Sequence, residues 1–128
     1  MLKVLIIEDT EDRQKILTSL YRSQAWVLVN TGHRAVKLIH AYKFDIISLD
    51  YNLRGEIDGA EVAVEIKQSQ NRDSRIVIHS LNPKGVDKIE KILPAAIPYP
   101  VSKIVRSNQR FKKIRDKINT LGIAYDWN

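Results

Sequence analysis

Short apolar runs alternate with amphipathic segments along this chain. Four runs, at residues 3–7, 26–29, 45–49 and 75–79, are continuous and rich in β-branched residues, which is typical of strands covered on both faces. Residues 95–99 form a weaker fifth candidate. Apolar positions recur at helical spacing in residues 11–22, 32–42, 58–68 and 86–93, and Ile104, Phe111, Ile114, Ile118 and Leu121 line the apolar side of a last, basic helix.

Five strand–helix units in this order predict an α/β fold with a parallel sheet between two layers of helices. The right-handed crossover rule and the chain length favour a flavodoxin-like, doubly wound (βα)5 sheet with the strand order 2-1-3-4-5. In such sheets, ligands bind outside the carboxyl ends of the strands, near the switch between strands one and three. That edge is where functional residues are expected.

Composition narrows the class of protein. The chain has 128 residues, of which 44% are hydrophobic and 28% charged, so we expect one domain over residues 1–128. The absence of a long apolar run and of a signal-peptide pattern predicts a cytoplasmic protein with no membrane partner. The lack of cysteine excludes a disulfide scaffold, a thiolate zinc site and cysteine catalysis.

Positive charge is concentrated near the C-terminus. Of the net charge of +6, residues 65–128 supply 13 Lys and Arg against 6 Asp and Glu, and seven of these cations fall within residues 103–117. Such a segment can attract phosphate-bearing partners, including nucleic acid. A solvated helix face is the simpler interpretation.

Acidic residues follow the first and third predicted strands. Glu8 and Asp9 end the first strand, and Asp50 ends the third. Because these strands are neighbours in the expected sheet, the three carboxylates converge and repel one another unless a cation lies between them. Oxygen ligands of this kind suit Mg²⁺, or Mn²⁺. Capping of the following helix is the alternative role for Glu8 and Asp9.

With these acids in place, the segments LIIED and IISLDYNLRGEIDGAEVAVEIK resemble the receiver domains of two-component response regulators over nearly the whole chain. The resemblance implies that Glu8 and Asp9 hold magnesium, that Asp50 accepts a phosphoryl group and that Ser80 contacts its oxygens. The pair Asp58–Gly59 also matches. Receivers carry Lys-Pro after strand five, whereas this chain has Tyr99–Pro100, and Lys103 follows three residues beyond that proline.

The segments EDTEDR, SLDYNL and HSLNPKG resemble a narrower group, the receiver-like domains expected to process cyclic phosphates. His79 can transfer a proton near neutral pH. The same segments supply four candidate phosphate-binding residues: Arg13, Asn52, Asn82 and Lys84. The hydroxyl of Ser80 is a further candidate for a phosphate contact.

Two of these assignments have ordinary structural alternatives. Strand alternation sends His79 and Ser80 to opposite faces, so His79 could instead lie under a helix. Arg13 could be an exposed cation that pairs with Asp9 or Glu11.

The sequence therefore favours a metal-dependent phosphoesterase or phosphotransferase that acts on cyclic phosphates, for example nucleotides or RNA 2′,3′-cyclic ends. Asp50 serves either as a metal ligand or as the nucleophile. One alternative is a response-regulator receiver that is phosphorylated on Asp50 and signals through protein partners. Another is a degenerate receiver that binds protein, or binds nucleic acid through its basic helix.

Overall fold

The sheet has the architecture expected from the sequence. The computed structural model describes residues 1–127, so Asn128, the last residue of the expected domain, lies outside the described residues. Five parallel strands are ordered β2-β1-β3-β4-β5, which confirms the flavodoxin-like arrangement. The strands are β1 (Lys3–Ile7), β2 (Ala25–Val29), β3 (Ile46–Leu49), β4 (Arg75–Ile78) and β5 (Ile97–Pro98).

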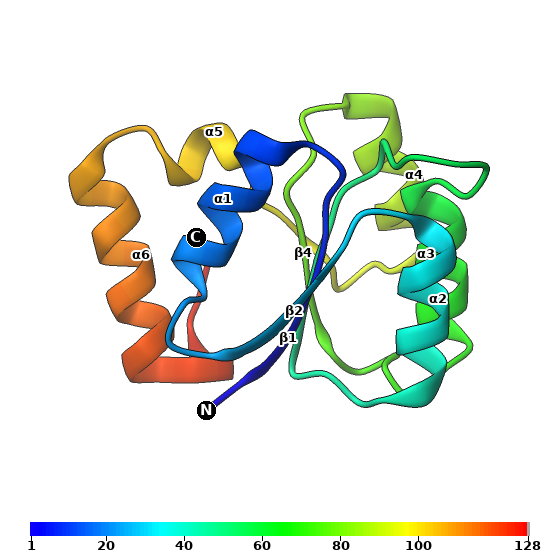
Figure 1. Ribbon diagram of the computed structural model, residues 1–128, viewed down its shortest axis with the longest axis horizontal. Helices are drawn as coiled ribbons and strands as arrows, with labels where there is room; N and C mark the ends of the chain where they lie inside the picture. The colour runs from blue at the N-terminus through cyan, green and yellow to red at the C-terminus, as the bar shows by residue number, and fades with distance from the viewer. Residues whose placement is uncertain (128) are drawn as a thin grey trace.

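Helices cover both faces of this sheet, with α1, α5 and α6 on one side and α2, α3 and α4 on the other (Figure 1). None of the helices within residues 1–127 has the length and apolar character needed to cross a membrane. A short 3₁₀ helix, Gly122–Ala124, follows the last of them. The helices are α1 (Glu11–Leu20), α2 (Gly32–Ala41), α3 (Gly59–Lys67), α4 (Pro83–Ile92), α5 (Val101–Ile104) and α6 (Asn108–Leu121).

Alternation along the strands divides the buried side chains between two cores. Leu5 and Ile7 of β1 belong to the core under α2, α3 and α4, whereas Val4 and Ile6 belong to the core under α1, α5 and α6. Glu8 follows β1 and has the same parity as Val4 and Ile6, so its side chain continues the face toward α1.

Helix α4 begins three residues earlier than the apolar periodicity predicted. The side-chain oxygen of Asn82 accepts a hydrogen bond from the Gly85 N–H at 3.1 Å, and Pro83 occupies the first helical position. Both are favourable at a helix start. Pro83 and Gly85, which precede the helix predicted over residues 86–93, therefore belong to the first turn of α4.

The last, basic helix is divided in two. Ile104 belongs to the short helix α5, and α6 starts anew after Ser107, whose hydroxyl accepts a hydrogen bond from the Arg110 N–H at 3.0 Å. Ile114 and Ile118 are buried as expected, but Leu121 is exposed. The hydrophobic pattern spans both helices because α5 and α6 pack on the same core.

Candidate active site

Glu8, Asp50 and His79 lie side by side at the carboxyl ends of β1, β3 and β4. The register pairs Ile7 with Leu49 and Leu49 with Ile78, so the next residue of each strand falls in one row. Backbone hydrogen bonds extend the sheet through this row, because Asp50 N–H donates to Ile7 O and His79 N–H donates to Leu49 O, both at 3.1 Å. Neighbours in one row of a parallel sheet point to the same face.

All three side chains are buried, with exposed fractions of 0% for Glu8 and 1% for both Asp50 and His79. The Nε2 atom of His79 lies 3.0 Å from Oε1 of Glu8. Its other ring nitrogen, Nδ1, shares a 2.7 Å hydrogen bond with the hydroxyl of Ser48. Both nitrogens are thus in contact with buried polar groups from neighbouring strands.

Arg13 supplies a cation to this row from the first turns of α1. Its Nε lies 3.0 Å from Oε1 of Glu8, and its Nη2 lies 3.5 Å from Oδ2 of Asp50. The same Nη2 donates a 2.9 Å hydrogen bond to the hydroxyl of Thr10. Arg13 therefore bridges the two carboxylates, and does not pair with Asp9 or Glu11 in any ion pair found among residues 1–127.

Each carboxylate uses one oxygen to fix its own position. Oε2 of Glu8 accepts from the Thr10 N–H at 3.0 Å, and Oδ1 of Asp50 accepts from the Tyr51 N–H at 2.8 Å. The other oxygens, with Nε2 of His79 and Nε of Arg13, are buried and find no hydrogen-bond partner of proper geometry within the described residues. These charged atoms contact one another as ion pairs but form no aligned hydrogen bonds. Burial of polar atoms without such hydrogen bonds lowers the free energy of unfolding.

The two carboxyl groups have opposite pKa shifts. Burial alone would raise the pKa of Glu8, but its contacts with His79, the Thr10 N–H and Arg13 outweigh burial and lower the pKa to about 2. Burial and the nearby Glu8 carboxylate raise the pKa of Asp50 to about 6, despite the opposing charges of His79 and Arg13. Glu8 is therefore ionised at neutral pH, whereas the surroundings of Asp50 disfavour its ionised form.

The remaining candidate residues from strand four lie at the start of α4. Ser80 is 5% exposed, and its hydroxyl accepts from the Asn82 N–H at 3.2 Å. Asn82 uses its side-chain oxygen to cap α4, and Lys84 is exposed on the first turn. Asn52 is exposed in the loop after β3.

Tyr51 joins the loop after β3 to α4. A Cβ atom on Gly85 would overlap the Tyr51 ring, so glycine is what allows the helix to approach this closely. Lys88 Nζ donates to the Tyr51 hydroxyl at 3.3 Å. Sequence reasoning gave no role to Tyr51 or Ser48, because each is recognised only through partners distant in the sequence.

Tyr99 stands where receiver domains carry a lysine, and it belongs to the hydrophobic core. Tyr99 is buried, packs against Trp127 with ring centroids 5.4 Å apart, and accepts a hydrogen bond from Arg110. Lys103 lies over the Tyr99 ring, with Nζ 5.7 Å from its centroid. Positive charge at the acidic row therefore comes from Arg13.

Glu8, Asp50 and His79 can hold a metal ion together. Their nearest ligand atoms all lie within 4.8 Å of one another, and this is the only such group of three or more His, Cys, Asp or Glu residues within residues 1–127. Asp9, assigned to the metal from the sequence, is outside the group and accepts a 3.4 Å hydrogen bond from Thr10. Two carboxylates and one imidazole are a chemically suitable ligand set for a divalent cation.

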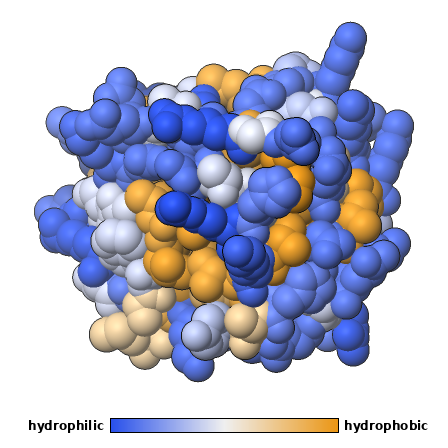
Figure 2. Space-filling view, turned by 45° about the vertical axis from the view of Figure 1, so that its right-hand side comes forward, coloured by the Kyte–Doolittle hydropathy of each residue, from blue (hydrophilic) through white to orange (hydrophobic). Residues whose placement is uncertain are grey.

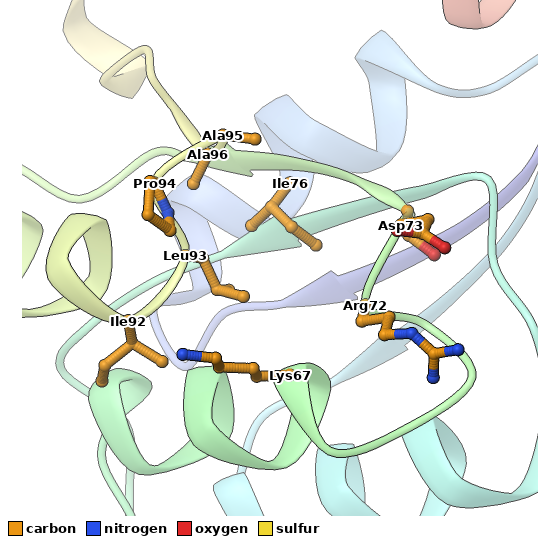
Figure 3. A pocket seen from close by; sticks show the side chains of 10 residues that line it. Lys67, Arg72, Asp73, Ile76, Ile92, Leu93, Pro94, Ala95 and Ala96 are labelled. Carbon is orange, nitrogen blue, oxygen red and sulfur yellow. The ribbon is translucent and has the colours of Figure 1, made fainter.

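Other hollows lie away from this row. One of about 340 Å³ occurs where β4 begins, between the ends of α3 and α4, with Ile76 and Leu93 among its apolar walls and Lys67, Arg72 and Asp73 also lining it (Figure 3). The side that carries α2, α3 and α4 shows apolar areas among hydrophilic side chains (Figure 2). None of the residues lining the first hollow belongs to the candidate site.

Solved structures share this fold. A phosphorylated cyanobacterial phytochrome response regulator, RcpA, is 20% identical, with a TM-score of 0.70 and coverage of 92% of this chain and 91% of that chain. The receiver domain of a sensor histidine kinase from Pseudomonas aeruginosa, with a magnesium ion in its active-site cleft, is 24% identical, with a TM-score of 0.63 and coverage of 88% and 97%. The Mn²⁺-bound response regulator Rcp1 is 20% identical, with a TM-score of 0.64 and coverage of 93% of each chain.

Sequence comparison identifies a narrower relationship. No curated protein matches the chain. Residues 3–95 match the family described as the cyclic-phosphate processing receiver domain, and this segment contains Glu8, Arg13, Asp50 and His79. The chain therefore belongs to the cyclic-phosphate processing receiver domain family.

Proposed function

We propose that this receiver domain is a metal-dependent phosphoesterase that opens cyclic phosphates, with nucleotide or RNA 2′,3′-cyclic ends as the substrate class. The observation that carries the proposal is the buried row of Glu8, Asp50 and His79, whose facing atoms lack aligned hydrogen bonds. Groups that are buried together at this cost are typical of a functional site. The family to which the chain belongs supports the same substrate class.

Glu8, Asp50 and His79 would hold the divalent ion, which fits their donor set. A bound divalent ion at this position supplies Lewis-acid polarisation of a phosphoryl oxygen and lowers the pKa of bound water. The Thr10 and Tyr51 N–H groups keep the two carboxylates in place for this task.

Arg13 would contact a nonbridging phosphate oxygen, since its guanidinium lies at the row and its side chain is 28% exposed. Ser80, Asn82 and Lys84 would add hydrogen bonds and charge from the start of α4, and Asn52 from the loop after β3. A water oxygen forms a bond to phosphorus while one ring phosphorus–oxygen bond breaks. The released alkoxide takes up the proton that the water loses, so the product is a phosphomonoester beside a free hydroxyl.

The basic segment supports a polymeric substrate. Lys112, Lys113 and Lys117 are exposed on α6, and Arg115 lies over the Phe111 ring, with its Cζ 5.5 Å from the centroid. Such a surface binds phosphates without reading bases. Contact with an RNA backbone through α6 is therefore part of the proposal.

The test is incubation of the full chain with Mg²⁺ or Mn²⁺ and a 2′,3′-cyclic nucleotide or a cyclic-ended oligonucleotide, with separation of the products. Wild type is expected to form the phosphomonoester, and Asp50→Asn is expected to form none. Asp73→Asn is the matched control, because Asp73 is exposed beside the start of β4. Equal product from wild type and Asp50→Asn would refute the site.

A phosphorylated receiver is the second candidate function. Asp50 follows β3 in a receiver fold, and its Oδ2 has no aligned hydrogen bond within residues 1–127, so it is placed to accept a phosphoryl group. The receiver lysine position is occupied by the buried Tyr99, which weighs against this candidate. Incubation with acetyl phosphate and intact-protein mass spectrometry would detect an aspartyl phosphate on wild type that Asp50→Asn lacks. A protein that shows neither turnover nor phosphorylation would be a binding module.

A further inference from the structure

We infer that His79 is a metal ligand, and that the site consequently prefers a first-row transition ion such as Mn²⁺ or Zn²⁺ to Mg²⁺. The inference rests on the proposed function in that it concerns the same site. It replaces the ligand set predicted from the sequence, Glu8, Asp9 and Asp50, with Glu8, Asp50 and His79. It also replaces the proton-transfer role that the sequence suggested for His79 with ligation.

The direction of the imidazole supports ligation. Nε2 of His79 points into the row and lies 3.0 Å from Oε1 of Glu8, but the pair does not have hydrogen-bond geometry. Two ligands bound at right angles, each about 2.1 Å from one ion, lie about 3 Å apart. The observed separation already matches that of neighbouring ligands.

Ser48 prepares the ring for this role. Its hydroxyl shares a 2.7 Å hydrogen bond with Nδ1 of His79, and Ser48 itself is 1% exposed in the middle of the sheet. When Nδ1 donates its proton to Ser48, Nε2 presents a lone pair to the row. A metal-bound histidine is usually fixed in this way through its second nitrogen.

Burial argues against proton transfer to substrate. The His79 ring is 1% exposed, and each of its nitrogens contacts a buried side chain. A general acid or base must come within hydrogen-bond reach of the substrate, directly or through one water. A ligand role for Nε2 requires no contact between the ring and the substrate.

The ligand type determines the preference among metals. Mg²⁺ favours oxygen ligands in near-octahedral geometry and keeps several waters, whereas imidazole suits transition ions. Asp9 would have supplied a third carboxylate, but strand alternation directs Asp9 away from the face of Glu8. Exchange of a carboxylate for an imidazole therefore weakens the binding of Mg²⁺ relative to first-row transition ions, most strongly relative to Zn²⁺ and less strongly relative to Mn²⁺.

The experiment uses the full chain without any substrate. Mn²⁺ is titrated with detection of free ion by electron paramagnetic resonance, Mg²⁺ is used as competitor, and pulsed measurement detects ¹⁴N directly bound to Mn²⁺. We expect wild type to show the ¹⁴N coupling and to favour Mn²⁺ over Mg²⁺ by at least about tenfold. His79→Gln should lose the coupling and most of the preference, since loss of even an outer-shell partner typically costs about 10- to 100-fold in affinity.

His40→Gln is the matched control, because His40 is exposed on α2 and pairs with Glu65; it should behave as wild type. Three results would overturn the inference: no binding of Mn²⁺, no ¹⁴N coupling in the Mn²⁺-loaded wild type, or an unchanged preference in His79→Gln. The coupling is measured on wild type, so poor folding of a variant does not affect it. Turnover plays no part in this measurement, so a failure of the proposed function is seen separately.

Discussion

The hydroxyl of Ser48 lies 2.7 Å from Nδ1 of His79, across the two central strands β3 and β4. Both side chains are 1% exposed, so neither can exchange this hydrogen bond for one to water. Through it, a residue in the middle of β3 fixes the ring that faces Glu8.

Ser48→Ala should therefore destabilise the protein and disturb His79 together. Loss of one partner leaves a buried ring nitrogen unsatisfied, which typically costs about 1–3 kcal/mol. Urea unfolding measures the free energy, and ¹⁵N-detected NMR of the imidazole reports the tautomer. Ser23→Ala, at an exposed position, should change neither; an unaltered His79 spectrum in Ser48→Ala would contradict the positioning role.

Asp50→Asn should stabilise the metal-free protein at neutral pH. The pKa of Asp50 is raised from its ordinary value of 3.8 to about 6, so the folded state holds this proton more tightly than the unfolded chain. Stability is therefore lost as the pH rises from about 4 to about 6, and the loss is complete above that range. The variant avoids this loss and should be more stable by about 1–3 kcal/mol near pH 7.5.

The difference between wild type and Asp50→Asn should disappear below about pH 4, where Asp50 is protonated in the folded state. Unfolding is measured across this pH range with a chelator present. A difference that stays constant with pH would show that ionisation of Asp50 is not its cause.

Arg13→Gln should increase metal affinity. The guanidinium lies 3.0 Å from Glu8 and 3.5 Å from Asp50, so it competes with a cation for the same oxygens. Removal of the charge should tighten Mn²⁺ binding by about three- to tenfold, which corresponds to roughly 1 kcal/mol. Calorimetric titration measures the affinity.

Arg22→Gln provides the comparison for Arg13, because Arg22 is exposed just beyond the end of α1. It should leave metal affinity unchanged. Weaker Mn²⁺ binding by Arg13→Gln would mean that Arg13 supports the ion and does not compete with it.

Gly85→Ala should destabilise the contact between α4 and the loop after β3. The added methyl group would overlap the ring of Tyr51, and overpacking of this kind costs about 1–3 kcal/mol. Replacement of the ring in the double variant Tyr51→Ala/Gly85→Ala should make the Gly85 substitution much less costly. Additive losses in a double-mutant cycle of unfolding free energies would refute the close approach.

The sequence predicted which edge of the sheet carries the site, because the acidic residues that follow strands one and three must lie at that edge. The sequence did not predict whether Glu8 or Asp9 faces the site. Alternation gives the relative faces of Glu8 and Asp9, but the face that lies toward the site depends on which core each strand buries. Glu8 therefore joined Asp50 and His79, while Asp9 did not.

Other features needed tertiary information. Ser48 looked like any small residue of a buried strand, and the fit of Tyr51 against Gly85 joins residues 34 positions apart. The start of α4, in contrast, carried a local signal, because Asn82 followed by Pro83 is a favourable helix beginning. The helix predicted over residues 86–93 therefore starts about one helical turn too late.

Cyclic-phosphate hydrolysis at this row is tested most directly by phosphorus NMR of a 2′,3′-cyclic nucleotide in ¹⁸O-enriched water with Mn²⁺ and the full chain. We expect the cyclic signal to be replaced by that of a phosphomonoester carrying one ¹⁸O, with wild type and with Asp73→Asn but not with Asp50→Asn. Persistence of the cyclic signal with wild type, or its equal loss with Asp50→Asn, would contradict cyclic-phosphate hydrolysis at this row.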